Sequence, residues 1–167
     1  MAQQTLFSYF GLSPRFRIDL DRLEAAHLAA IKKVHPDLFA QRPAAERRVA
    51  EQWSTRLNEA YQTLKDPVRR ATYLCESAGW DVGAEKNTAM PMDFLLLQMR
   101  WRETLDNQKD NAEVINRLRE EVLSLQGEVE VELEKALDVD ANYEAAVALV
   151  RKLMFITKFR TQLQQIQ

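Results

Sequence analysis

The chain has 167 residues, 46% of them hydrophobic and 29% charged, a composition typical of a folded globular protein and not of a disordered one. The net charge of −2 gives no support to nucleic-acid binding, and a single cysteine, Cys75, excludes an internal disulfide and a Cys-x-x-Cys metal site. Residues 1–80 carry 12 basic and 9 acidic side chains, a net of +3, whereas residues 81–167 carry 11 and 16, a net of −5. Two different partners or ordinary solvated helix faces would both explain this asymmetry.

The sequence shows no sign of export or membrane insertion. Residues 1–4 contain no basic group leading into an apolar run, as a secretory signal would. The longest apolar run, residues 94–97, is far too short to cross a bilayer. A lone cysteine also fits a reducing compartment, so we expect a cytoplasmic protein that does not associate with a membrane.

The first elements of the chain are expected to be helical, because the whole sequence contains only 4 glycines and 5 prolines. An apolar cluster over residues 6–12 predicts one or two helical turns. Asp19 or Asp21 can then cap a helix that Pro36 ends. Its apolar residues recur at helical spacing and predict one buried stripe: Leu20, Leu23, Ala26 or His27, Ala30 or Ile31, and Val34.

A second helix is predicted to start near Ala44, after a loop over residues 35–43, and to end at Pro67. Two helices joined by a short connection usually pack antiparallel. Their inward face is predicted to include Val49, Trp53, Leu57, Ala60 or Tyr61, and Leu64. A third amphipathic helix follows Pro67 and stops near Gly79, with Cys75 on its inward face.

The second half of the chain begins after an interruption of the helical periodicity at residues 80–91. Three helical patterns follow, at about residues 91–107, 111–137 and 141–165. Asp140 or Asn142 can cap the last of them. The middle pattern carries a heptad-like stripe, and the last a similar one, so we predict a three-helix antiparallel bundle. The two stripes are Ile115, Leu118, Val122, Leu125 and Val129, and Leu149, Leu153, Ile156 and Leu163.

The tripeptide His35-Pro36-Asp37 follows the first long helix, and alone it is weak evidence of function. The stretch Asn58–Tyr73 strengthens it, because it reads N-E-A-Y-x-x-L-x-D-P-x-x-R-x-x-Y and resembles the same segment of J-domains. An antiparallel hairpin would display the tripeptide at its tip. The resemblance implies an all-α fold with an N-terminal J-domain, an antiparallel helical hairpin with short flanking helices.

The resemblance narrows to one family on three further segments. Residues 9–12 (Tyr-Phe-Gly-Leu), the stretch from Tyr73 to Gly79, and residues 150–153 (Val-Arg-Lys-Leu) resemble HscB, the J-protein of bacterial iron–sulfur cluster assembly. The family implies a J-domain at residues 1–80, a linker at 81–90 and a three-helix scaffold-binding domain at 91–167. It also implies two partners: an HscA-type ATPase chaperone of the DnaK class, which the J-domain stimulates, and an IscU-type scaffold protein.

The tripeptide suits docking on physical grounds as well. Pro36 stiffens the loop, Asp37 offers a carboxylate for an arginine, and His35 offers a donor and an acceptor. Lys32 and Lys33 place positive charge at a helix C-terminus, where it is favoured. These five residues are the predicted chaperone-binding site. J-domains often carry an aromatic residue eight positions before the histidine and a basic helix around it, whereas this chain has His27 there among Leu28, Ala29 and Ala30.

The helix at residues 91–107 has two apolar stripes where a bundle needs one. On a helical wheel, Leu97, Trp101 and Leu105 lie within about 60° of Phe94 and should pack inward. A second stripe lies nearly opposite, and such exposed apolar patches often bind partners. The predicted scaffold-binding residues are Met92, Leu95, Leu96, Met99, Glu103 and Phe155, and the resemblance to HscB implies the same role for Leu95, Leu96, Met99, Glu103 and Phe155. Arg100 departs from the family, which can carry an acid there. The alternative is a helix buried on both faces, with the J-domain covering the second one.

Other functions stay open from the sequence. The second half could bind clients other than the scaffold, or the chain could be a passive helical adaptor. An enzyme is the most distant alternative: Cys75 and His35 could be imagined as a nucleophile and base, but no local pattern supports this pair, and Cys75 is expected to be buried. His27 and His35 would lie about 12 Å apart along one helix and cannot share a metal. We expect a monomer with no cofactor and no metal.

Overall fold

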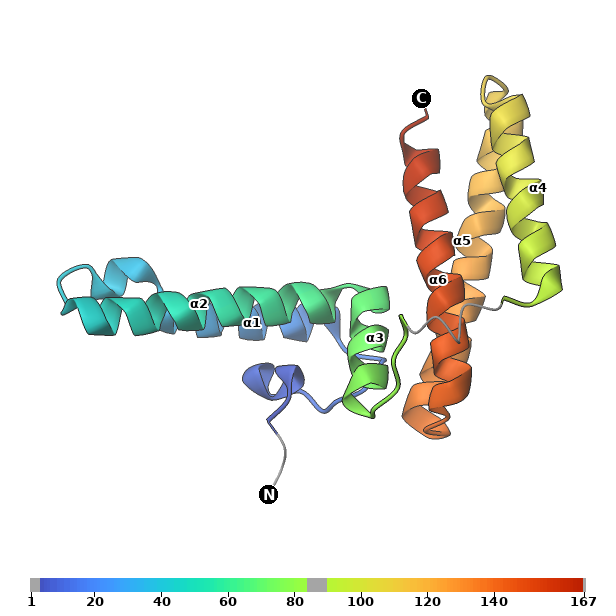
Figure 1. Ribbon diagram of the computed structural model, residues 1–167. Helices are drawn as coiled ribbons and strands as arrows, with labels where there is room; N and C mark the ends of the chain where they lie inside the picture. Colours follow the sequence, from blue (N-terminus) through green and yellow to red (C-terminus); the bar gives the residue numbers. More distant parts are fainter. Residues whose placement is uncertain (1–3, 84–89, 167) are drawn as a thin grey trace. The chain divides into compact units, whose positions relative to one another are not determined.

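The computed structural model describes residues 4–83 and 90–166 (Figure 1). Every regular element in these two ranges is a helix, which confirms the all-α prediction. The chain divides into two compact units, Met1–Leu74 and Cys75–Gln167. Each unit has its own core and is described separately below.

The first unit is built on an antiparallel hairpin of α1 (Leu20–Val34) and α2 (Ala44–Lys65) (Figure 1). Asp19 caps α1, because its carboxylate accepts the backbone N–H groups of Asp21 and Arg22. The predicted loop after α1 begins with a 3-10 turn, η2 (Pro36–Phe39). Pro36 favours that turn, since its fixed φ is already helical and its missing N–H is not needed at a first helical position.

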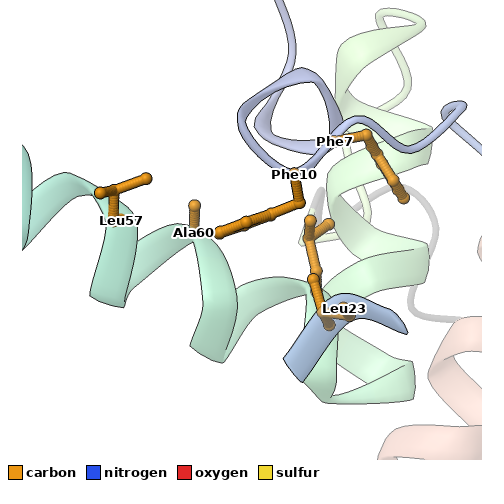
Figure 2. Close-up of a cluster of buried hydrophobic side chains, with 6 residues drawn as sticks. Phe7, Phe10, Leu23, Leu57 and Ala60 are labelled. Carbon is orange, nitrogen blue, oxygen red and sulfur yellow. The ribbon is translucent and has the colours of Figure 1, made fainter. Parts of the chain in front are cut away.

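Two short elements complete the first unit: the 3-10 helix η1 (Leu6–Phe10) and the part of α3 (Pro67–Ser77) up to Leu74. Gly11 ends η1 in the left-handed conformation, with φ of 63°. The Tyr73 hydroxyl of α3 accepts the Leu6 N–H at 3.0 Å and ties α3 to η1. Figure 2 shows Phe10 of η1 pointing towards Ala60 of α2. The buried core of this unit is Phe7, Phe10, Leu23, Leu57, Ala60 and Leu64.

Three residues of the predicted buried stripes are exposed: Leu20 (50%), Val49 (52%) and Trp53 (36%). Trp53 meets Tyr9 edge-on, with ring centroids 6.0 Å apart, and that contact accounts for part of its burial. The α2 residues that pack with η1 in the buried core are Leu57, Ala60 and Leu64, and in the outer half of the helix only the small side chain of Ala50 is buried. The stripe prediction was wrong there because it assumed a cover along the whole helix.

The second unit contains α4 (Met92–Gln108), α5 (Ala112–Glu134) and α6 (Tyr143–Gln164), the predicted three-helix bundle (Figure 1). A π-helical turn, η4 (Lys135–Val139), continues α5. Asn111 and Asn142 cap α5 and α6 through their side-chain oxygens. The predicted stripes of α5 and α6 are buried, except for Leu125, which is half-buried.

The predicted domain limits cannot be matched residue by residue to this division. The two units meet at Leu74, a few residues before the predicted boundary near residue 80. Val82, in the predicted linker, is buried, and its carbonyl accepts two hydrogen bonds from Arg151 of α6 at 2.6 and 3.0 Å. Residues 84–89 of the linker lie outside the described residues. The limits 1–80, 81–90 and 91–167 stay predictions.

Candidate protein-binding sites

The hairpin tip, which we define as Lys32, Lys33, His35, Pro36 and Asp37, lies where α1 passes into η2. The His35 ring Nδ1 accepts the Asp37 backbone N–H at 3.2 Å. An accepting Nδ1 places the ring proton on Nε2, which remains available as a donor. The Asp37 carboxylate is 92% exposed and lies 3.6 Å from Nδ1. The predicted loop residues are therefore brought together at one exposed turn.

Lys32 and Lys33 are exposed in the last turn of α1, and no acidic side chain in the described part of the chain pairs with them. The negative end of the helix dipole favours both charges. Leu38, directly after Asp37, is 60% exposed. Sequence reasoning missed Leu38, although an apolar residue in a loop between two prolines was a usable signal.

An apolar groove of about 340 Å³ runs beside the hairpin tip. It lies between the outer halves of α1 and α2 and the turn η2, where Val49 and Trp53 are left exposed. Sequence reasoning did not predict this groove, because it placed Val49 and Trp53 on a buried stripe. The groove is lined by Val34, Phe39, Ala45, Glu46, Val49, Ala50 and Trp53.

The motif residues on α2 hold the two hairpin helices in register. His27 of α1 stacks on Tyr61, with ring centroids 4.2 Å apart and planes 9° from parallel. Its Nε2 lies 2.9 Å from the Asn58 side-chain oxygen. His27 is half-buried, as is Ala26, the other residue predicted for that position of the buried stripe.

Arg70 lies on α3, and its side chain is buried in the first unit, with 6% of its surface exposed. Its guanidinium donates to the backbone carbonyls of Phe16 at 2.6 Å and Leu64 at 2.7 Å, and it lies 4.8 Å from the centre of the Phe16 ring. These bonds offset the cost of burying the charge. The arginine of the J-domain pattern is therefore structural in this chain.

The α4 patch, which we define as Met92, Leu95, Leu96 and Met99, is exposed by 70%, 39%, 57% and 66%. The opposite face of α4 is buried, with Phe94 6% and Trp101 0% exposed, while Leu97 and Leu105 are half-buried. Within the second unit, α4 therefore has the two distinct faces that the helical wheel predicted, one buried in the bundle and one left exposed by it. Glu103, one turn after Met99, is also exposed.

Phe155 of α6 is half-buried and belongs to an aromatic cluster at the contact of α4 with α6. Its ring centroid lies 5.8 Å from that of Phe94, 6.2 Å from Trp101 and 5.9 Å from Phe159. The Arg102 guanidinium lies over it at 5.6 Å. Phe155 therefore supports the bundle and also leaves part of its own surface exposed.

Arg100, the departure from the family pattern, forms an ion pair with Glu121 of α5. Trp101 also donates its indole N–H to Glu121 at 3.2 Å. Burial tends to raise the pKa of Glu121, but the hydrogen bonds from Arg100 and Trp101, with the charge of Arg100, lower it overall. The positive charge of Arg100 is thus balanced within the bundle.

Cys75 is fully buried, as predicted from its place on the third helix. Burial, with the nearby charge of Glu76, raises the pKa of its thiol to about 11. A protonated, inaccessible thiol is a poor nucleophile at neutral pH. Within the described ranges no helix is long and apolar enough to span a membrane.

Comparison with known proteins points to one family. Residues 90–164 match the family model described as the HSCB C-terminal oligomerisation domain. A co-chaperone HscB homolog of Bordetella petrii is 47% identical, over 98% of this chain and 96% of that protein. The solved structure of HscB from Vibrio cholerae has a TM-score of 0.87 and 31% identity, over 98% of this chain and 97% of that one. The crystal structure of human HscB has a TM-score of 0.90 and 25% identity, over 96% of this chain and 81% of the human one. The exposed His-Pro-Asp turn on a helical hairpin and the three-helix bundle agree with these matches. The chain therefore belongs to the HscB family of J-domain co-chaperones.

Proposed function

We propose that this co-chaperone stimulates the ATPase of an HscA-type chaperone of the DnaK class through the hairpin tip. The same molecule delivers an IscU-type iron–sulfur scaffold protein through the α4 patch, with Phe155 and Glu103 at its edges. It acts in the bacterial cytoplasm and does no chemistry of its own. Its work is to bring two proteins together.

The exposure of four large apolar side chains on α4 carries this proposal. The bundle already buries the opposite face of the helix, so folding gives no reason for a second apolar face. Two of the four residues are methionines, whose flexible side chains adapt to a partner surface. The hairpin tip supports the first half of the proposal, because His35 and Asp37 are exposed and serve no core contact.

Two measurements on the purified full-length chain test this function. ATP hydrolysis by an HscA-type chaperone should rise when the chain is added, and rise further with an IscU-type scaffold present. A passive helical adaptor would leave the ATPase rate unchanged. A direct binding assay with the scaffold separates the proposed client from other clients, since a chain that stimulates the ATPase without binding the scaffold serves another protein.

We propose that the chain acts as a monomer. The matching family model is described by its oligomerisation, so the oligomeric state must be measured. Sedimentation velocity at micromolar concentration distinguishes one copy of 19.4 kDa from two.

A further inference from the structure

The C-terminal bundle carries opposite charge on neighbouring helices. Helix α5 (Ala112–Glu134) holds seven acidic and two basic side chains, whereas α6 has a single acid, Glu144, in its first turn. Residues 145–166 then contain four basic side chains and no acid: Arg151, Lys152, Lys158 and Arg160. The α6 side of an acidic unit is thus locally basic.

Two of these four cations serve the bundle itself. Arg151 donates to the Val82 carbonyl, and Arg160 donates to the Gln126 side-chain oxygen at 3.2 Å. Lys152 and Lys158 have no carboxylate partner among the residues that the structure describes, and Lys158 is exposed. Charge that is neither paired nor buried is available to a partner.

Lys152, Lys158 and Arg102 of α4 lie over, or one helical turn away from, the aromatic cluster that contains Phe94 and Phe155. Arg102 lies over the Phe155 ring at 5.6 Å, and Lys152 lies over the Phe94 ring at 5.7 Å. Lys158 follows Phe155 by one turn of α6. Contact with an aromatic face attracts a cation without neutralising it, so the rings hold Arg102 and Lys152 in place as full positive charges.

We infer that Arg102, Lys152 and Lys158 form a basic rim that selects the partner of the α4 patch by charge. This inference rests on the proposed function of the patch. The partner is a protein surface that is apolar at its centre and carries aspartate or glutamate on the side facing α6. Glu103, at the C-terminal end of the patch, has the opposite sign, so the rim and Glu103 together fix the direction in which the partner lies.

Charges at the edge of an interface act mainly on the association rate and on its salt dependence. The Debye length is about 8 Å at physiological ionic strength and about 3 Å at 1 M salt. The basic rim should therefore strengthen binding at low salt and contribute little at high salt. The apolar patch should be nearly insensitive to this change.

The experiment measures the affinity of the full-length chain for a purified IscU-type scaffold at 50 mM and 500 mM salt. The variants are Lys158→Glu, Arg102→Glu and their combination, with Lys109→Glu as an exposed control outside the rim. Lys158 is exposed and forms no ion pair in the described part of the chain, so Lys158→Glu keeps the test valid if Arg102→Glu displaces Phe155. The double variant should bind roughly tenfold more weakly at 50 mM salt, and most of the difference should vanish at 500 mM.

The inference fails if the rim variants bind the scaffold as tightly as Lys109→Glu at low salt. The double variant Leu96→Ala with Met99→Ala then separates the role of the α4 patch from that of the basic rim. If only this variant weakens scaffold binding, the proposed function stands and the basic rim alone is refuted. If no variant weakens binding, the proposed function fails as well. Self-association of the native chain that Lys158→Glu abolishes would assign the rim to a second copy, through its acidic α5, and would overturn the inference.

Discussion

Replacing Leu96 and Met99 with alanine separates binding from folding. The two side chains are 57% and 66% exposed, so less than half of each is buried in the free protein. Full burial of such a side chain is worth about 1.5–3 kcal/mol, and truncation here should therefore cost about 0.5–1 kcal/mol of stability at each site. Alanine is a better helix former than either residue, which offsets part of that loss.

Binding should lose more than stability does. The exposed part of each side chain is what a partner would bury, and it is worth about 1 kcal/mol per residue. The double variant should therefore bind the scaffold about thirtyfold more weakly, which corresponds to about 2 kcal/mol. Calorimetric titration with the scaffold measures the affinity, and urea unfolding measures the stability.

A matched core variant gives the comparison. Leu153 of α6 is fully buried, and Leu153→Ala should cost about 2–5 kcal/mol of unfolding free energy. The reasoning is refuted if Leu96→Ala with Met99→Ala destabilises the protein as much as Leu153→Ala does. Unchanged scaffold affinity in the double variant would refute it equally.

Three further predictions concern the first unit. His35→Gln or Asp37→Asn should abolish ATPase stimulation and leave the melting temperature nearly unchanged, because both side chains lie in an exposed turn; a large drop in melting temperature would make them structural. A fragment of residues 1–80 should fold, as judged by circular dichroism, and stimulate the ATPase weakly without enhancement by the scaffold; an unfolded fragment would show that the two parts share a core. Arg70→Leu should lower the free energy of unfolding by about 2–4 kcal/mol, because two buried carbonyls lose their donor; a loss below about 0.5 kcal/mol would contradict that role.

Local sequence predicted the α-helices and where most of them begin and end, but not the 3-10 turn η2 or the π-helical turn η4. Asp19, Asn111 and Asn142 cap helices because a short polar side chain can satisfy the first free N–H groups without help from the rest of the fold. Pro36 and Pro67 stop helices for equally local reasons. The apolar periodicity of α5 and α6 likewise predicted their buried faces, since each stripe packs along its whole length.

The hairpin tip could also be predicted from the sequence. Its residues are neighbours along the chain, so a motif read in order already places them in one turn. The second face of α4 was visible for the same reason, because a helical wheel depends on local geometry alone. The wheel could not say that the face stays uncovered, and the structure supplied that fact.

Tertiary structure alone decided the contacts between distant segments. It left Val49 and Trp53 exposed beside a groove, paired Arg100 with Glu121, and gathered Arg102 and residues of α6 around Phe155. Periodicity reports which side of a helix is apolar, but burial and charge pairing depend on what another helix places against that side. That neighbour is many residues away in the chain, and its position follows from the packing of the whole unit.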